Sequence, residues 1–160
     1  MNKTTMELEG ERALVITRTF DGPPRVVFEA WTRPEHVRRW WAPRSRQVSI
    51  VACDADVRVG GRYRYVLRHD GGDDDIAFSG EYTEITPHSR LVYTQTFEPM
   101  AHAGHAVVTV TFEERGGKTR LVAHELYPSR AVRDGAIASG MEEGMRETLD
   151  QLDLLVATLG

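Results

Sequence analysis

Apolar side chains recur at steps of three, four or five residues through the C-terminal part of the chain, from Arg130 to Leu159. This spacing keeps them on one stripe of a helix with 3.6 residues per turn, and charged residues take the opposite face. Pro128 and Ser129 supply a break and a hydroxyl able to cap the first turn. The pattern predicts one long amphipathic helix from Arg130 to about Thr158. Its apolar stripe is Val132, Ile137, Met141, Met145, Leu149, Leu152, Leu155 or Val156, and Leu159, and its charged face is Arg133, Asp134, Glu142, Glu143, Arg146, Glu147, Asp150 and Asp153.

A helix of this length is longer than an average strand, so a broad sheet that curls around it is its natural cover. The upstream chain has the pattern of such a sheet, because apolar and polar residues alternate in short runs between turn residues. The first predicted strand, Arg12 to Phe20, follows a polar lead-in and alternates Leu14, Ile16, Arg18 and Phe20 with Ala13, Val15, Thr17 and Thr19. The later predicted strands are Gln47 to Val57, Arg62 to Arg68, Ile76 to Ile85, Leu91 to Phe97, Val107 to Phe112 and Thr119 to Tyr127.

Two short helices are predicted after the first strand. Pro24 suits the first turn of one helix, where its missing N–H costs nothing, and the pattern from Thr32 to Glu35 caps a second helix over Pro34 to Trp40. Only turns join the last six strands, and the polar run from Asp70 to Asp75 is one of the hairpin tips. The predicted fold class is therefore α+β, with a seven-stranded antiparallel sheet around a long C-terminal helix.

Composition bounds the class of protein. The chain has 160 residues, 41% of them hydrophobic and 28% charged, with a net charge of −4. These values fit one domain spanning residues 1–160, with a core from about 12 to 159, and they disfavour nucleic acid as a partner. The single cysteine, Cys53, cannot form an internal disulfide, and its strand-like setting predicts a buried inert thiol. No apolar signal core or membrane-length run is present, so we expect a soluble cytoplasmic protein with no membrane insertion.

Several ordered motifs resemble those of a known family. The matching segments are Arg18 to Pro23, Phe28 to Thr32, Pro34 to His36, Arg39 to Trp41, Val59 to Tyr63, Gly80 to Tyr82, Pro87 with Arg90 to Val92, and Gly140 to Gly144. From Leu14 to Leu159 the chain is similar to the activator of heat-shock protein 90 ATPase homologue, C-terminal-domain-like family, of the START-like or SRPBCC superfamily. The resemblance implies a helix-grip fold, in which the sheet wraps the long helix and leaves a cavity between them. Members of the superfamily bind lipids, sterols, polyketides or plant hormones, and a few catalyse cyclisation or dehydration.

The best candidate site is the apolar space between the long helix and the concave sheet. Such spaces enclose a small ligand and orient it with a few polar groups. Tyrosines on neighbouring strands favour a cavity over a fully packed core, because each buried hydroxyl needs a hydrogen-bond partner. The sequence leaves open which strand face they occupy. The candidate ligand-binding residues are Phe28, Trp31, Trp41, Tyr63, Tyr65, Phe78, Tyr82, Tyr93, Phe97, Met141 and Met145.

Other polar residues give weaker signals. Arg18, Arg64, His69, His124 and Glu125 lie in predicted strands and could point inward as an acid, base or anion anchor, but alternate positions of a one-sided sheet face water. The outward orientation is the stronger expectation. The pair His102 and His105 lacks a third ligand in register, so no metal and no cofactor are predicted. No catalytic triad can be argued from spacing.

Three functions remain open. The leading hypothesis is a binder of a small hydrophobic or amphipathic molecule, and an enzyme is less favoured. The alternatives are a stress-response or co-chaperone module that contacts another protein, and a cyclase- or hydrolase-type enzyme that uses the same cavity. The eukaryotic members of the resembled family carry a further N-terminal domain for which this chain has no room, so a chaperone partner is disfavoured. The oligomeric state, including a homodimer, is left open.

Overall fold

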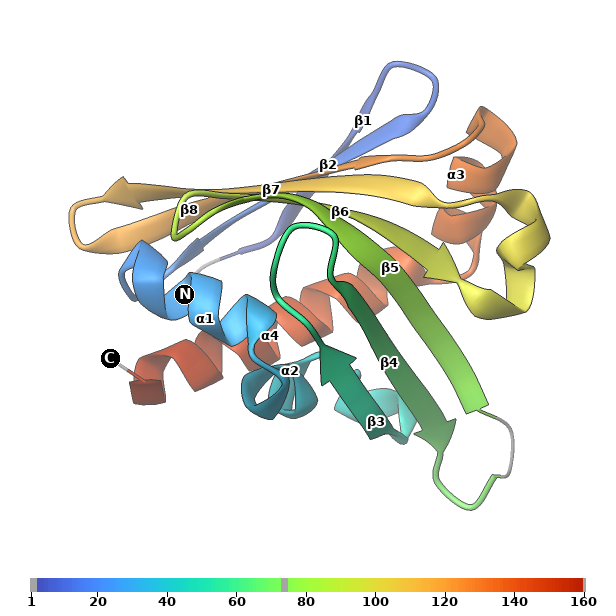
Figure 1. The fold of residues 1–160 in the computed structure, drawn as a ribbon, viewed down its shortest axis with the longest axis horizontal. Coiled ribbons are helices and arrows are strands. Elements are labelled where there is room, and N and C mark those ends of the chain that lie inside the picture. Colours follow the sequence, from blue (N-terminus) through green and yellow to red (C-terminus); the bar gives the residue numbers. More distant parts are fainter. Residues whose placement is uncertain (1–2, 73–74, 160) are drawn as a thin grey trace.

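Residues 3–72 and 75–159, which the computed structural model describes, form one curved sheet of eight antiparallel strands crossed by a C-terminal helix (Figure 1). The strands are β1 (Thr5–Glu9), β2 (Ala13–Phe20), β3 (Val48–Ala55), β4 (Arg62–His69), β5 (Asp75–Thr86), β6 (Arg90–Phe97), β7 (Ala106–Arg115) and β8 (Lys118–Leu126). Their order in the sheet is β1-β2-β8-β7-β6-β5-β4-β3. The α+β class and the antiparallel meander are as predicted. The hairpin tip predicted from Asp70 to Asp75 includes Asp73 and Asp74, which lie outside the described residues.

The strand count predicted from the sequence is wrong by one, because β1 was read as a polar lead-in. β1 is an edge strand that pairs with β2 from Thr5 opposite Thr17 to Glu9 opposite Ala13. Only Met6 of this strand packs against the core, and its other residues are exposed. Met6 and Leu8 do alternate with Glu7 and Glu9, but the run is only five residues long and Leu8 is 60% exposed. So short an alternation between charged residues is a weak strand signal, and the strand forms through its pairing with β2.

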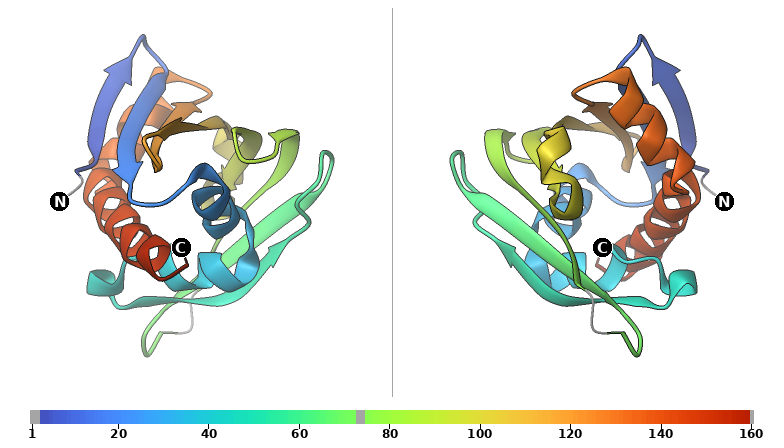
Figure 2. Two further views of the ribbon diagram at one scale, coloured as in Figure 1. Left: turned by 90° about the vertical axis from the view of Figure 1, so that its left-hand side faces the viewer. Right: turned by 90° about the vertical axis from the view of Figure 1, so that its right-hand side faces the viewer.

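The two short helices are present at the predicted positions, as α1 (Pro24–Thr32) and α2 (Pro34–Trp40). Each begins with a proline in its first turn, where the missing N–H is tolerated. They pack against the C-terminal helix and fill one end of the curved sheet (Figure 2). Short 3₁₀ helices η1 (Arg44–Arg46) and η2 (Glu98–Ala103) follow α2 and β6.

The C-terminal helix is divided in two, so the prediction of a single helix is wrong. α3 (Arg130–Ala138) ends at Ser139 and Gly140, and α4 (Met141–Leu159) continues from there. Gly140 has a φ of +89°, a left-handed conformation that glycine adopts freely and that ends a helix. The apolar stripe continues across the break, so periodicity alone could not reveal it. Leu149 and Leu152 of α4 are fully buried, as predicted.

Arg133 of α3 was predicted on the solvated face but is buried. Its Nη1 donates hydrogen bonds to the carbonyl oxygens of Gly10, at 3.0 Å, and Ala13, at 3.3 Å. These contacts join α3 to the β1–β2 hairpin. A buried guanidinium is stable here because backbone carbonyls and Asp134 accept its hydrogen bonds.

Arg18 of β2 is a second buried arginine, although the sequence favoured an outward orientation. It alternates with Thr17 and Thr19 and so shares the concave face of the sheet with Leu14, Ile16 and Phe20. Its guanidinium pairs with Asp150 and with Asp153 at 3.0 Å, and it donates to the Thr4 hydroxyl at 3.1 Å. The ion pairs join β2 directly to α4.

Candidate functional site

The space between the concave sheet and the helices is almost completely filled by side chains. A void of about 10 Å³ remains, which is about the volume of one water probe. It is lined by Trp31, Trp41, Tyr63, Tyr65, Tyr82, Leu91, Tyr93 and Gln95. Among residues 3–72 and 75–159, the side chains around this void therefore leave no open cavity of the kind expected from the sequence, and a ligand would have to displace them to enter.

Tyr63 of β4 lies at the centre of an aromatic cluster around this void. Its ring centroid is 5.0 Å from that of Tyr65 and 5.5 Å from those of Tyr82 and Tyr93. Alternation along β4 and the neighbouring strands directs these rings to one face, as the pattern of Tyr63, Tyr65 and Leu67 predicted for β4. The alternate positions on β4, such as Arg62, are exposed, whereas Tyr63 and Tyr65 are buried.

The two adjacent tryptophans, Trp40 and Trp41, lie in different surroundings. Trp40 is buried beneath the short helices, and its Nε1 donates to the carbonyl oxygen of Ala30 at 2.9 Å. Trp41 is half-buried and borders the void, and its ring centroid lies 5.1 Å from that of Tyr65 and 4.9 Å from that of Phe78. Trp40 is therefore structural, and Trp41 belongs to the candidate site.

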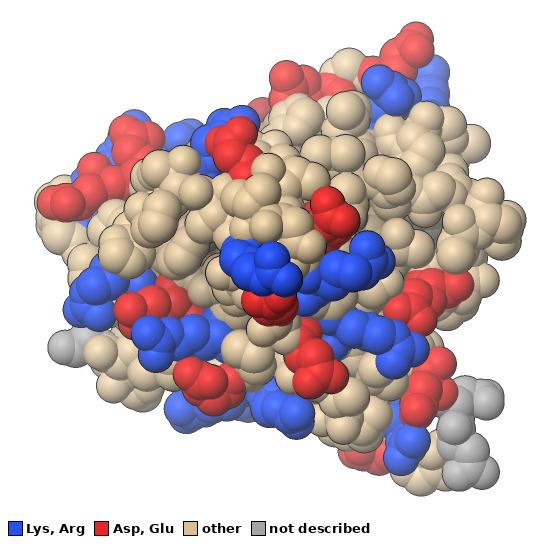
Figure 3. Space-filling model, in the orientation of Figure 1, with Lys and Arg blue, Asp and Glu red and all other residues tan. Residues whose placement is uncertain are grey.

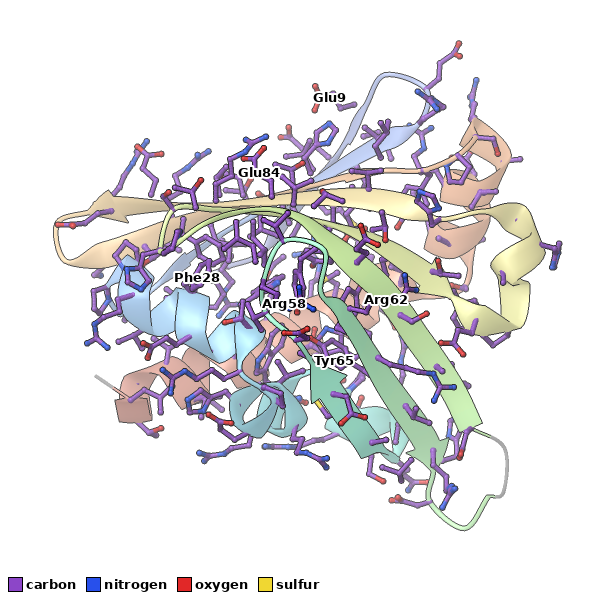
Figure 4. All side chains as sticks on the ribbon, viewed as in Figure 1. Glu9, Phe28, Arg58, Arg62, Tyr65 and Glu84 are labelled. Carbon is purple, nitrogen blue, oxygen red and sulfur yellow. The ribbon has the colours of Figure 1, made fainter. Side chains whose placement is uncertain are left out.

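The remaining predicted site residues lie at different distances from the void. Phe78 packs against Trp41, and Phe97, which is 38% exposed, packs against Phe78 with centroids 5.1 Å apart. Met141 and Met145 are half-buried against the core. Phe28 does not line the void: it packs against His88 and Phe112 under α1, away from Tyr65 (Figure 4).

Hydroxyl groups give this interior a polar character. The Tyr63 hydroxyl donates to the carbonyl oxygen of Thr94 at 2.7 Å, and Trp31 Nε1 donates to the Tyr93 hydroxyl at 3.4 Å. The hydroxyls of Tyr65 and Tyr82 are hydrogen-bonded to each other. Burial raises the pKa of Tyr82 to about 12 and raises the pKa values of the other three tyrosines as well. All four therefore stay neutral at physiological pH.

Gln95 lines the void and was missed by the sequence reasoning, and Glu125 was named but expected to face outward. Glu125 of β8 is only 6% exposed, and its Oε1 accepts a hydrogen bond from the Tyr127 hydroxyl at 2.8 Å. Burial raises the pKa of Glu125, and the bond from Tyr127 opposes this rise in part. The preference for an outward Glu125 is wrong because it shares its face with Leu121 and Ala123. That alternation was the available signal.

Arg64 and His124 face outward, as the sequence favoured, and His69 is exposed at the end of β4 although it shares the alternation class of Tyr63 and Tyr65. Arg64 is exposed and its Nε lies 2.9 Å from Glu98, His69 is exposed, and the Nε2 of half-buried His124 lies 3.6 Å from Glu9. Figure 3 shows basic and acidic side chains interspersed over one face of the molecule. An open groove of about 640 Å³ on the outer side of the sheet is bordered by Arg64 and Arg68. Their charges are neutralised by ion pairs with Glu98 and Asp75, which also border the groove.

Two further expectations concern cysteine and metals. Cys53 is buried, and burial raises its pKa to about 11, so the thiol is unreactive as predicted. Among residues 3–72 and 75–159, no group of three His, Cys, Asp or Glu side chains could hold a metal ion. Within the same residues, no helix is both long enough and apolar enough to cross a membrane.

The glycines of the α3–α4 junction leave room that is taken by an arginine. The Nη2 of Arg46 donates to the carbonyl oxygen of Gly140 at 2.6 Å, and a Cβ on Gly144 would lie 3.2 Å from Arg46 Nη1. Exposed Arg46 can move. We therefore expect Gly144→Ala to change the free energy of unfolding by less than about 1 kcal/mol, because the gain in helix propensity offsets the shift of Arg46. Chemical denaturation would measure this change in the free energy of unfolding. A loss of stability above about 2 kcal/mol would mean that the Arg46 side chain cannot move aside.

Comparisons with known proteins agree with this architecture. The model of the family described as Activator of Hsp90 ATPase homolog 1-like protein matches residues 21–157. A protein of Rhodobacter sphaeroides has a similar structure, with a TM-score of 0.88, 23% identity, and coverage of 99% of this chain and 100% of that one. A Staphylococcus epidermidis protein has a TM-score of 0.82 and 26% identity, with coverage of 96% of this chain and 94% of that one. CalU16 of Micromonospora echinospora has a TM-score of 0.64 and 20% identity, with coverage of 98% of this chain and 86% of that one. Among proteins with curated descriptions, none matches the sequence.

Proposed function

Because the chain belongs to the Activator of Hsp90 ATPase homolog 1-like protein family, we propose that it binds a small amphipathic molecule between α4 and the concave face of its sheet. The observation that carries this proposal is the chemistry of the interior. Four tyrosines, Gln95 and Glu125 surround or adjoin the void, where a purely structural core would use aliphatic side chains. Aromatic walls with a few convergent polar groups are typical of small-molecule sites.

Entry of a ligand requires side chains that can move aside. Met141 and Met145 are half-buried, and methionine adapts its shape easily because its chain is unbranched. Phe97 and Trp41 are partly exposed on the same side of the interior. The break at Gly140 separates α3 from α4, so α3 can shift without unwinding α4. Together these features support a route from solvent to the void.

Binding is expected to be saturable and stabilising. A fluorescent apolar probe should bind the protein at one site, and its binding should raise the melting temperature with probe concentration, because it favours the folded state by mass action. Met141→Trp should lower probe affinity at least tenfold by filling the interior. Leu154→Trp is the matched control, since Leu154 is 68% exposed on the same helix and should leave affinity unchanged.

The opposite results would count against the proposal. If the probe bound without saturation, or bound both tryptophan variants as tightly as the unmodified protein, the interior would be closed to ligands. A protein partner on the outer surface would then become the better hypothesis. Differential scanning fluorimetry and fluorescence titration are sufficient to separate these cases.

A further inference from the structure

Gln151 is a buried polar residue on the face of α4 that packs against α2. It is 8% exposed, and its neighbours on this face, Thr148 and Leu155, are buried as well. A leucine would bury the same surface without losing hydrogen bonds to water, whereas a buried amide is costly unless protein groups replace those bonds. The presence of an amide here is therefore explained by the bonds that it makes.

The amide of Gln151 holds the backbone on both sides of Trp41. Its Nε2 donates to the carbonyl oxygens of Trp40 and Ala42, each at 2.9 Å, and its Oε1 accepts from the backbone N–H of Arg44 at 3.0 Å. A side-chain amide has two N–H donors, and both are used on the two residues that flank Trp41. The backbone of Trp41 is thereby fixed relative to α4, and the direction of its side chain is fixed with it.

Capping of α2 accounts for only one of these three hydrogen bonds. The Trp40 carbonyl is one of the last four of α2, which a helix leaves without internal partners. The bonds to Ala42 and Arg44 lie beyond the helix and are not needed to end it. The same connection is also fastened to α4 one turn away, where the backbone N–H of Ser45 donates to the Glu147 carboxylate at 2.7 Å.

The side chain that Gln151 directs is part of the wall of the void. Trp41 lines the void, and its ring packs against Tyr65 on β4 and Phe78 on β5. Side chains leave only about 10 Å³ free there, so the position of one indole ring decides whether a ligand has room. Gln151 lies behind Trp41 and does not line the void itself.

We propose that Gln151 is a positioning residue of the interior, which holds Trp41 against Tyr65 and Phe78 and so limits the entry of a ligand. This inference rests on the proposed function, because it names the residue that governs access to the same interior. Gln151 acts through Trp41 and makes no contact with the ligand. Its replacement should therefore matter only while Trp41 is present.

Fluorine NMR tests whether Gln151 positions Trp41. With 5-fluorotryptophan the protein has three labelled side chains, whose resonances are assigned by single Trp→Phe variants. Gln151→Met keeps most of the volume and removes both donors, so the Trp41 resonance should shift and broaden, while that of Trp40, whose indole N–H is bonded to α1, should stay in place. Thr148→Val is the matched control, because this buried hydroxyl bonds within α4 and its loss should leave all three resonances unchanged.

The rate at which a probe enters tests what the positioning does. N-Phenyl-1-naphthylamine, an uncharged apolar fluorophore, should associate with Gln151→Met about tenfold faster than with the unmodified protein, the factor that one net hydrogen bond supplies. Trp41→Ala should speed association as well, and Gln151→Met should add nothing in that background, because the side chain that it directs is gone. A general loosening of the fold by Gln151→Met would speed association in both backgrounds.

The outcomes distinguish this inference from the proposed function. If the Trp41 resonance stays in place in Gln151→Met, if it moves without a change in the association rate, or if the rate rises equally with and without Trp41, the positioning role is wrong while the interior still binds ligands. If the probe binds none of the variants, the proposed function fails, and the NMR comparison alone decides whether Gln151 positions Trp41. Should Gln151→Met fail to fold, Gln151→Ala replaces it in the same cycle, because water can then bond to the freed carbonyl groups.

Discussion

Replacement of Arg18 by alanine is expected to lower the free energy of unfolding by about 3–5 kcal/mol. The side chain is 2% exposed and joins β2 to α4 through Asp150 and Asp153. Asp150 is half exposed, so water compensates much of its loss, but the Asp153 side chain is only 17% exposed and would lose its ion pair with Arg18 near the core. The substitution also leaves a cavity beside Phe20, over which the guanidinium lies.

Denaturant unfolding monitored by circular dichroism would measure the loss. Arg115→Ala is the control, because Arg115 forms an ion pair with Glu113 at 3.0 Å on the surface and should cost less than about 1 kcal/mol. Arg18→Met tests the cause, since it keeps most of the volume and removes the charge. A loss below about 1 kcal/mol for Arg18→Ala would show that its ion pairs contribute little to holding α4 against the sheet.

Gly80→Ala is expected to lower the free energy of unfolding by at least about 3 kcal/mol, which is at the upper end of the destabilisation that overpacking causes. A Cβ at this position would lie 1.8 Å from the carbonyl oxygen of Thr94 and 2.8 Å from the Tyr63 ring. The nearer contact is with backbone, so no side-chain rotation can relieve it. The pairing of β5 with β6 would have to open where the backbone N–H of Glu81 donates to the Thr94 hydroxyl and the Tyr63 hydroxyl donates to the Thr94 carbonyl oxygen.

The same substitution at a glycine in α3 should change the free energy of unfolding in the opposite direction. Gly135 lies inside α3, and a Cβ there would meet nothing within 4 Å. Gly135→Ala should therefore stabilise the protein by up to about 1 kcal/mol through helix propensity. Thermal and denaturant unfolding of both variants would check the pair. Equal effects of the two substitutions would mean that β5 and β6 adjust at Gly80 without loss of pairing.

Much of this architecture could be predicted from alternation. The strand pattern placed Tyr63 and Tyr65 on one face of β4, and the prolines marked the starts of α1 and α2. These features are local, because a period of two or a proline at a first helical turn depends on neighbouring residues only. The family motifs then supplied the sheet that wraps a long helix, which the structure confirms apart from the number of strands.

The rest depends on contacts that are distant in sequence. The β1 strand exists through its pairing with β2. Arg18 and Arg133 are buried because a carboxylate of α4 and a carbonyl of the β1–β2 hairpin accept their hydrogen bonds. The extent to which side chains fill the interior depends on their rotamers and volumes, and binary patterning carries no information on either. The break at Gly140 falls within a continuous apolar stripe, so only the backbone conformation reveals it.

The pairing of β2 with β8 has a consequence for synthesis on the ribosome. Phe20 of β2 is opposite Thr119 of β8, about a hundred residues later, whereas β3 to β7 each pair with the strand that follows. At about 5–20 residues per second, the N-terminal hairpin waits roughly 5–20 s before its partner strand emerges. During that interval Leu14, Ile16 and Phe20 are uncovered and one edge of β2 is unpaired. The nascent chain is therefore most vulnerable to wrong pairing at its beginning, and the sheet can close only when its last strand has left the exit tunnel.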